Sequence, residues 1–328
     1  MPVTRFLPSR QTADALLRLS RADKPIGSYL LLAPTLWSAY LGAAAHALPL
    51  ASTVPTAAAL SVGAFAMRSA ACVVNDALDR RVDARVARTA LRPLASGEVT
   101  LEQAGLLLLG HLSLAGGVFL TLDPTSQLLS LASLPLVAAY PLAKRWTDYP
   151  QMVLAATINW GALVGYSAMT GGDVALEVVL PLYLASGCWA FSYDTVYAHQ
   201  DKADDVHAGV RSSALALGDR TRVVLTGVVG VAYAALLHAG MVVEAMDSSR
   251  FDMDIFFIGS TLGASGMLWQ VLAVDLDNGE SCSRAFVQGG KFVSLAVGLG
   301  IVGALVVGEK KEKKKLQQGV LQRETMAE

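Results

Sequence analysis

Residues 57–83 read AAALSVGAFAMRSAACVVNDALDRRVD, an apolar run that ends in a dense cluster of charges. The apolar part is about 20 residues long, which lets an α-helix cross a hydrocarbon core of about 30 Å. Carboxylates so close to a membrane span are costly and need a partner or a function. The stretch therefore predicts a membrane helix whose charged end belongs to a functional site.

Similar apolar runs recur along the rest of the chain. The 328 residues are 53% hydrophobic and 16% charged, with a mean hydropathy of +0.46, which excludes an ordinary soluble domain of this size. We expect an all-α polytopic membrane protein of about nine transmembrane helices. The expected spans are 26–46, 57–77, 101–121, 125–143, 152–171, 174–197, 221–245, 253–275 and 287–308.

Three regions follow from this pattern. Residues 1–25 are basic and predict an amphipathic segment on the membrane surface, with a short mitochondrial presequence as the alternative. Residues 26–308 form the intramembrane domain, and residues 309–328 are a charged tail that we expect to be disordered. Trp37 and Trp146 lie near span ends and are typical of interface anchors.

Lysine and arginine fall almost entirely on one side of the expected membrane. The N-terminus and every second loop hold 18 of them, whereas the opposite loops hold only Arg250. The positive-inside rule then places the N-terminus and the large loops on the cytoplasmic or matrix side. Nine spans put the tail on the other side, yet six tail residues are Lys or Arg, so the sequence leaves the side of the tail open.

The acidic cluster that ends the opening stretch has helical spacing. Asp76, Asp79 and Asp83 stand at i, i+3 and i+7 and share one helical face, with Asn75 at its edge. Arg68 lies eight residues before Asp76, about 12 Å deeper along the same helix. A buried guanidinium needs an anion, which is either the carboxylate of a substrate or an acidic side chain in a structural ion pair.

A second acidic cluster occurs four spans later. Asp194, Asp201 and Asp205 stand at i, i+7 and i+11, again on one face of a continuous helix. Both clusters lie at the basic-side end of an even-numbered span, which indicates a weak internal duplication and two acidic faces that meet across a cavity. One such cluster is usually a solvated helix end, but two at matching positions favour a functional site.

The residue types at these clusters favour a prenyl diphosphate as substrate. Carboxylates in one pocket repel each other unless a cation lies between them, and oxygen ligands together with phosphate favour Mg²⁺. Nearby lysine and arginine suit the phosphate oxygens, and an apolar chamber suits a lipid tail. The three scattered cysteines and five dispersed histidines argue against a disulfide framework and a zinc site.

Several segments match one known pattern, and the match covers most of the chain. They are residues 23–27, 67–72, 75–83, 86–97, 140–151, 159–161 and 193–205. These segments resemble the UbiA family of intramembrane prenyltransferases, and the Ala198-His199-Gln200-Asp201 form resembles the branch that prenylates 4-hydroxybenzoate in ubiquinone synthesis. Leu78 departs from the family, which usually has an aromatic residue there, as does Gln288-Gly289, where a Ser-Asn pair is usual.

The resemblance implies a nine-helix bundle around a central cavity, with two Mg²⁺ ions at the acidic motifs. The metal ligands and catalytic residues that it implies are Asp76, Asp79, Asp201 and Asp205. Together with the charge pattern, it assigns substrate binding to Asn75, Asp83, Arg68, Lys24, Tyr140, Lys144, Arg145, Asp194 and Tyr197.

The expected function is Mg²⁺-dependent transfer of a polyprenyl group from its diphosphate to 4-hydroxybenzoate, ortho to the hydroxyl, in ubiquinone biosynthesis. The alternatives are another aromatic acceptor (homogentisate, a naphthoate or another phenolic acid) and a non-catalytic ion transporter. The expected partners are both substrates, the bilayer and other ubiquinone-biosynthesis proteins, with no nucleic acid. The expected location is the mitochondrial inner membrane with the site facing the matrix, or a cell inner membrane with the site facing the cytoplasm.

Overall fold

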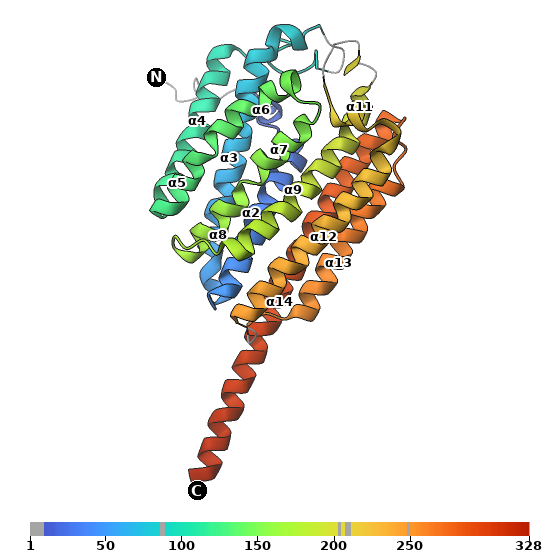
Figure 1. Ribbon diagram of the computed structural model, residues 1–328. Helices are drawn as coiled ribbons and strands as arrows, with labels where there is room; N and C mark the ends of the chain where they lie inside the picture. The colour runs from blue at the N-terminus through green and yellow to red at the C-terminus, as the bar shows by residue number, and fades with distance from the viewer. Residues whose placement is uncertain (1–9, 86–88, 203–204, 207–210, 248–249, 328) are drawn as a thin grey trace, which may run out of the picture. The chain divides into compact units, whose positions relative to one another are not determined.

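The computed structural model describes residues 10–327 except 86–88, 203–204, 207–210 and 248–249. Every regular element in the described residues is helical (Figure 1), which confirms the prediction of an all-α protein. Eight helical segments in this part of the chain are long and apolar enough to cross a membrane. The first expected span is the 20-residue helix α2 (Ile26–Ala45), which falls short of that hydropathy, so the expected count of nine is close.

Two of the expected spans are each divided into two consecutive helices. One is interrupted at Ser133, between α5 and α6, and the other at Trp160, between α7 and α8. The elements besides α2 are α1 (Arg10–Leu19), α3 (Leu50–Asp83), α4 (Leu101–Thr121), α5 (Pro124–Ala132), α6 (Leu134–Trp146), α7 (Pro150–Asn159), α8 (Gly161–Thr170), α9 (Leu176–Ala198), η2 (His199–Asp201), α11 (Ser213–Leu217), η3 (Gly218–Arg220), α12 (Thr221–Met246), α13 (Met253–Leu272) and α14 (Gly279–Ala327).

The chain divides into two compact units, and each has its own packing. The first unit comprises Met1–Ser28 and Ala59–Thr121, and the second comprises Tyr29–Ala58 and Leu122–Glu328. The first acidic motif therefore belongs to the first unit, whereas the second acidic motif belongs to the second unit.

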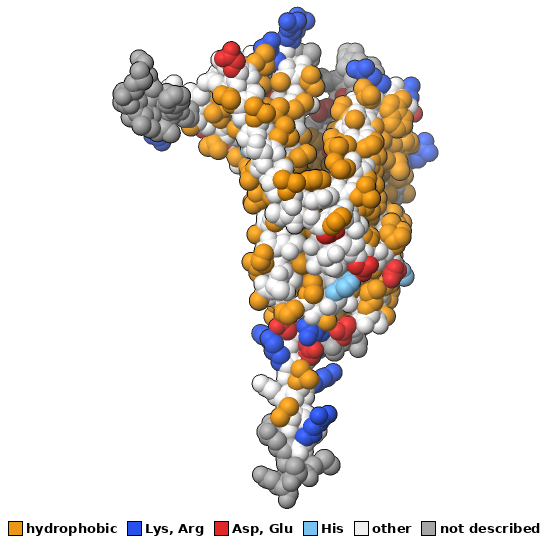
Figure 2. All heavy atoms as spheres, turned by 90° about the vertical axis from the view of Figure 1, so that its left-hand side faces the viewer, with side chains coloured by type: hydrophobic (Ala, Val, Ile, Leu, Met, Phe, Trp, Pro, Cys, Tyr) orange, Lys and Arg blue, Asp and Glu red, His pale blue; other side chains and the backbone are white. Residues whose placement is uncertain are grey.

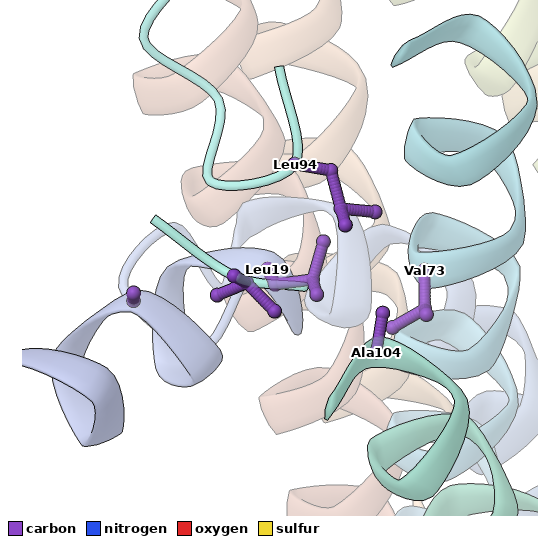
Figure 3. Packing of buried hydrophobic residues seen from close by; sticks show 6 residues of the cluster. Leu19, Val73, Leu94 and Ala104 are labelled. Carbon is purple, nitrogen blue, oxygen red and sulfur yellow. The ribbon is translucent and has the colours of Figure 1, made fainter. Parts of the chain in front are cut away.

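The core of the first unit joins α1, α3, α4 and the segment between α3 and α4. Figure 3 shows Leu19 and Leu94 next to Val73 and Ala104, and all four side chains are buried. Polar contacts reinforce this packing, because the Ser69 hydroxyl donates to the Ser20 carbonyl oxygen at 3.1 Å. The end of α1 is thus fixed against the helix that carries the first acidic motif.

The helices of the second unit approach closely at glycines. A Cβ atom added to Gly259 of α13 would lie 2.4 Å from the Cα of Gly300 in α14, and one added to Gly165 of α8 would lie 2.1 Å from the Thr35 carbonyl oxygen in α2. Backbones come this near only where side chains are absent, as in other membrane helix pairs. α12, α13 and α14 accordingly run side by side in Figure 1.

The charged tail is helical in the structure, although its composition predicts disorder. α14 continues to Ala327, and Figure 1 shows its end projecting beyond the neighbouring helices. Lys, Glu, Gln and Leu all favour helices, and Lys313 pairs with Glu309 one turn earlier at 2.6 Å. Figure 2 shows charged side chains where α14 leaves the bundle and along the projecting part. The region boundaries at residues 25 and 308 stay predictions.

Candidate active site

Asp76 is the buried centre of the first acidic motif. Its side chain is 1% exposed, and both of its carboxylate oxygens accept from Arg21 Nη2 at 2.8 Å. Its Oδ1 also accepts from Arg92 Nη1 at 3.1 Å. A buried carboxylate is tolerated when it is paired and hydrogen-bonded, so these two arginines account for its position.

Arg92 joins two carboxylates of the motif. The same Nη1 atom that contacts Asp76 donates to Asp83 Oδ2 at 2.9 Å, and the Thr89 hydroxyl donates to the Asp83 carbonyl oxygen at 3.1 Å. The segment after α3 therefore folds back over the end of its own helix. Asp76 and Asp83, which lie two turns apart on α3, thus share Arg92 as a counter-ion.

The other members of the first motif lie at the surface of the first unit. Asn75 and Asp79 are exposed, and so is Lys24. Asp76 and Asp83 are buried, so the expected acidic face is divided between a paired, buried part and an open part. Leu78, the residue that departs from the family, is 80% exposed and lines an apolar groove between α3 and α4.

The sequence pattern alone did not identify Arg21 and Arg92 as residues of the site. Arg92 stands inside one of the matched segments, but only the folded structure gives its partners. Arg21 adopts a positive φ of 57°, a conformation that side chains other than glycine rarely adopt. Its Nη1 donates to the Arg18 carbonyl oxygen at 3.0 Å while Nη2 holds Asp76. Residues with such unfavourable backbone conformations cluster at functional sites, where the surrounding structure holds them in place.

The second motif begins on α9 and continues through a 3₁₀ turn. α9 ends at Ala198 and is followed by η2, which ends at Asp201. The uninterrupted α-helix that we assumed between Asp194 and Asp201 is therefore wrong, because three residues of 3₁₀-helix advance by about 120° each instead of about 100°. A buried hydrogen bond fixes this turn, with His199 Nε2 and Thr221 Oγ1 3.1 Å apart.

The remaining predicted residues of the second unit differ in exposure. Lys144 is exposed. Arg145 is also exposed. The partly buried residues are Tyr140, Asp194, Tyr197, Asp201 and Asp205. The roles of these residues in binding a ligand stay a prediction.

A row of aromatic rings runs through the interior of the second unit. Trp37 stacks on Trp189 with ring centroids 5.2 Å apart, and Trp189 meets Tyr193 edge-on at 5.3 Å. Phe286 of α14 extends the row to Tyr197 at 4.5 Å. Trp37 is 4% exposed, so its prediction as an interface anchor is wrong. A small cavity lies beside Trp37 and Trp189 and is lined mostly by apolar side chains.

The donor chemistry of the first motif fits a hard cation. Asp76, Asp79 and Asp83 supply only carboxylate oxygens, which are the ligands that Mg²⁺ prefers. The described residues contain no group of three or more His, Cys, Asp or Glu side chains arranged to hold a metal ion. Arg21 and Arg92 provide the positive charge at Asp76 and Asp83 instead. The meeting of the two motifs across one cavity stays a prediction.

The sequence of this chain matches one family model and is similar to several named proteins. The model of the UbiA prenyltransferase family matches residues 31–296. The mitochondrial 4-hydroxybenzoate polyprenyltransferase of Arabidopsis thaliana is 44% identical over 86% of this chain, which spans 66% of that protein, just under two thirds. The protein of the same name from Drosophila melanogaster is 39% identical over 97% of this chain and 79% of its own length.

Solved structures share the fold. A UbiA homolog from Aeropyrum pernix K1 superposes with a TM-score of 0.61 at 24% identity, over 83% of this chain and 96% of that one. A UbiA homolog from Archaeoglobus fulgidus, bound to GPP and Mg²⁺, superposes with a TM-score of 0.56 at 17% identity, over 88% and 99% of the two chains. At these identities the likeness concerns the fold alone.

Proposed function

The chain belongs to the UbiA prenyltransferase family, and on that premise we propose that it transfers a polyprenyl group from polyprenyl diphosphate to 4-hydroxybenzoate. The observation that carries the proposal is the 39% identity with the Drosophila 4-hydroxybenzoate polyprenyltransferase over 97% of this chain. Prenylation of this acceptor is a step of ubiquinone biosynthesis. The names of the relatives also support a place in the mitochondrion, and we extend this to the inner membrane with the acidic motifs facing the matrix.

Mg²⁺ is the proposed cofactor, as in the Archaeoglobus neighbour. Asp76, Asp79, Asp201 and Asp205 are the proposed ligands. Bound there, the metal would neutralise the negative charge that grows on the departing diphosphate. The proposed substrate-binding residues are Asn75, Asp83, Arg68, Lys24, Tyr140, Lys144, Arg145, Asp194 and Tyr197.

The reaction is an electrophilic aromatic substitution. The bond between the allylic carbon and the diphosphate oxygen breaks, and its electron pair leaves with the diphosphate. The ring carbon ortho to the hydroxyl then gives an electron pair to the allylic carbon and loses its proton, which restores the aromatic ring. Arg21 and Arg92 already place positive charge at the first motif, where it would favour departure of an anion.

The membrane setting suits this chemistry because water would capture the allylic cation. The chain provides a mostly apolar interior in the second unit, where Trp189 is 1% exposed and Tyr193 is 2% exposed. The faces of such rings attract a cation without reacting with it. Tyr193 and Trp189 are therefore suited to line the path of the allylic end.

The test supplies the purified protein in lipid with labelled 4-hydroxybenzoate and a polyprenyl diphosphate, with and without Mg²⁺. We expect a prenylated acid by mass spectrometry only when the metal is present. Homogentisate and a naphthoate serve as competing acceptors in the same assay. Product from one of these but not from 4-hydroxybenzoate would assign the chain to another acceptor, and ion flux without product would support a transporter.

A further inference from the structure

His111 places an imidazole in the middle of an apolar span. It stands ten residues from either end of α4, whose only other ionisable side chain, Glu102, lies in the first turn. Only 6% of the apolar stretch of this span is buried. An ionisable side chain at this depth is costly, so its contacts point to what the protein uses it for.

The imidazole donates a hydrogen bond to the end of α1. His111 Nε2 lies 3.0 Å from Ser20 Oγ, and Ser20 is 5% exposed. The Ser20 hydroxyl donates to the Leu16 carbonyl oxygen at 3.1 Å. Because a hydroxyl has one hydrogen and a carbonyl oxygen can only accept, Ser20 Oγ accepts from His111 and the imidazole carries a proton on Nε2. Phe65 of α3 meets the ring edge-on, with centroids 6.1 Å apart.

Ser20 directly precedes Arg21 in the turn that ends α1. The Ala22 amide donates to the Leu17 carbonyl oxygen at 3.0 Å, and the Arg21 amide donates to the Arg18 carbonyl oxygen at 3.1 Å. These two bonds form a Schellman motif, whose left-handed position is usually glycine. Arg21 occupies that position with a φ of 57°. The turn therefore carries a side chain that its backbone disfavours, and this side chain reaches the first acidic motif.

Two helices hold Ser20 from different groups of the same residue. Its carbonyl oxygen accepts from the Ser69 hydroxyl of α3 at 3.1 Å, while its hydroxyl accepts from His111 of α4. Both contacts restrain the backbone next to Arg21. A relaxation of Arg21 to a negative φ would turn its guanidinium away from Asp76, so these contacts oppose the loss of that pair.

We propose that His111 is a positioning residue, which acts through Ser20 to keep Arg21 in its left-handed conformation with the guanidinium at Asp76. The inference rests on the proposed function, because the charge of Arg21 is there assigned to the departure of the diphosphate. His111 acts on the reaction only through Arg21. What the turn requires from α4 is a hydrogen-bond donor at the place of Nε2.

The experiment replaces His111 by residues that differ in donor position. The amide nitrogen of glutamine lies as many bonds from Cα as histidine Nε2, whereas that of asparagine lies one bond nearer. We expect His111→Leu and His111→Asn to lower kcat/KM for polyprenyl diphosphate about 3- to 10-fold, the value of one hydrogen bond. His111→Gln should restore most of this loss, and the Michaelis constant for 4-hydroxybenzoate should stay the same in all three. His238→Leu, at an exposed position of the α12 span, is the matched control.

Double variants test the route through Ser20 and Arg21. Arg21→Gln removes the side chain that His111 positions, so adding His111→Leu should cause no further loss of kcat/KM. Ser20→Ala should match His111→Leu, and the two together should equal either alone. A role in packing only would make these losses additive. The same combinations are measured by thermal unfolding in detergent with chelator, which gives a readout that does not depend on activity.

Each outcome bears on one hypothesis. An unchanged kcat/KM in His111→Leu, an equal loss in His111→Gln, or a full additional loss in the Arg21→Gln background would overturn the positioning role and leave the proposed function standing. Absence of product from 4-hydroxybenzoate in the unchanged protein would instead overturn the proposed function. The unfolding data would then decide on His111 alone, since coupling with Arg21 supports the positioning role and additivity overturns it.

Discussion

At the scale of single residues, the site is organised by charge balance around Asp76. Two arginines from segments on either side of α3 in the sequence reach this one carboxylate, and Arg92 also reaches Asp83. Removing one partner from a buried pair leaves an uncompensated charge, which costs about 3–5 kcal/mol. The arginines therefore stabilise the motif and also keep positive charge where the diphosphate is expected.

Arg92→Gln should destabilise the first unit, because Asp83 loses the partner shown for its side chain and Asp76 loses one of two. We expect a loss of about 3 kcal/mol without metal, measured by thermal unfolding in detergent with chelator present. Added Mg²⁺ should recover part of this loss, since a cation can replace the missing charge. Arg81→Gln, at an exposed position of α3, is the control. Equal stability of the two variants would contradict the pairing.

Loss of a proposed metal ligand should lower the turnover of the folded protein, and Asp76→Ala should in addition lose the stabilisation that its pairs with Arg21 and Arg92 supply. Asp76→Ala and Asp201→Ala are each expected to reduce kcat at least about 100-fold, the effect of removing one electrostatic stabiliser. Asp254→Ala, which removes an exposed carboxylate in the first turn of α13, should retain full activity. Steady-state rates of purified, folded variants check this. Near-normal turnover of either ligand variant would remove that residue from the site.

The sequence predicts some of these residues and not others, for physical reasons. The i, i+3, i+7 spacing of Asp76, Asp79 and Asp83 places them correctly on one helix, because helical periodicity is local. The pairing of Arg21 with Asp76 joins residues 55 positions apart and depends on a left-handed turn, which no local pattern specifies. Trp37 was misassigned for the same reason, since its partner Trp189 comes from a distant helix.

At the scale of elements, helix ends were harder to predict than helices. The sequence locates the apolar runs, but the change to 3₁₀ after Ala198 and the extension of α14 depend on hydrogen bonds and on tail composition rather than on hydropathy. The N-terminus of α13 is an example. Asp252 Oδ1 accepts from the Ile255 amide at 3.1 Å, and its Oδ2 accepts from Lys311 of α14. One side chain thus caps one helix and ties it to another.

The contact between α13 and α14 at Asp252 should become less stable at low pH. The hydrogen bonds from Lys311 and the Ile255 amide hold the pKa of Asp252 below its usual range. A depressed pKa means that the stabilisation is present above the unfolded value of about 3.9 and is lost as the pH falls through the folded value. We expect hydrogen exchange at the Ile255 amide to be independent of this ionisation from pH 7 down to about 5, and to accelerate below about 4.

Asp252→Asn removes the ion pair with Lys311 but keeps the helix cap, because Asn caps helices about as well as Asp. The variant should lack the acid-dependent acceleration and should be only slightly less stable at neutral pH, because solvent screens the exposed Lys311. Asp254→Asn should behave like the unchanged protein. If hydrogen exchange at the Ile255 amide of Asp252→Asn accelerates equally at low pH, a group other than Asp252 is responsible.

At the scale of the whole molecule, the contacts of the second unit bear on the side of the tail. Glu309 accepts from the Leu50 amide at 3.3 Å, and Arg250 contacts Glu312 at 2.7 Å and donates to the Ala47 carbonyl oxygen at 2.7 Å. The base of the tail thus lies with the α2–α3 turn and the loop before α13. The sequence puts both on the side poor in basic residues, so the six basic tail residues do not decide its location.

Labelling with a membrane-impermeant thiol reagent in sealed vesicles tests this topology. A cysteine introduced at Ala84, in the basic loop after α3, should react only from the cytoplasmic or matrix side, whereas one at Gln318, exposed on α14, should react only from the opposite side. The native Cys72 and Cys282 are buried, and the unchanged protein gives the background. Reaction of both cysteines from one side would require an even number of spans between them and the loss of one crossing from the expected nine. Because α2 precedes Ala84, its crossing cannot change this result, and the missing crossing would lie among the spans after Ala84. The two interrupted spans, α5–α6 and α7–α8, would then be the first candidates, and a cysteine at Asp173, exposed in the turn between α8 and α9, would show whether the crossing is lost before or after that turn.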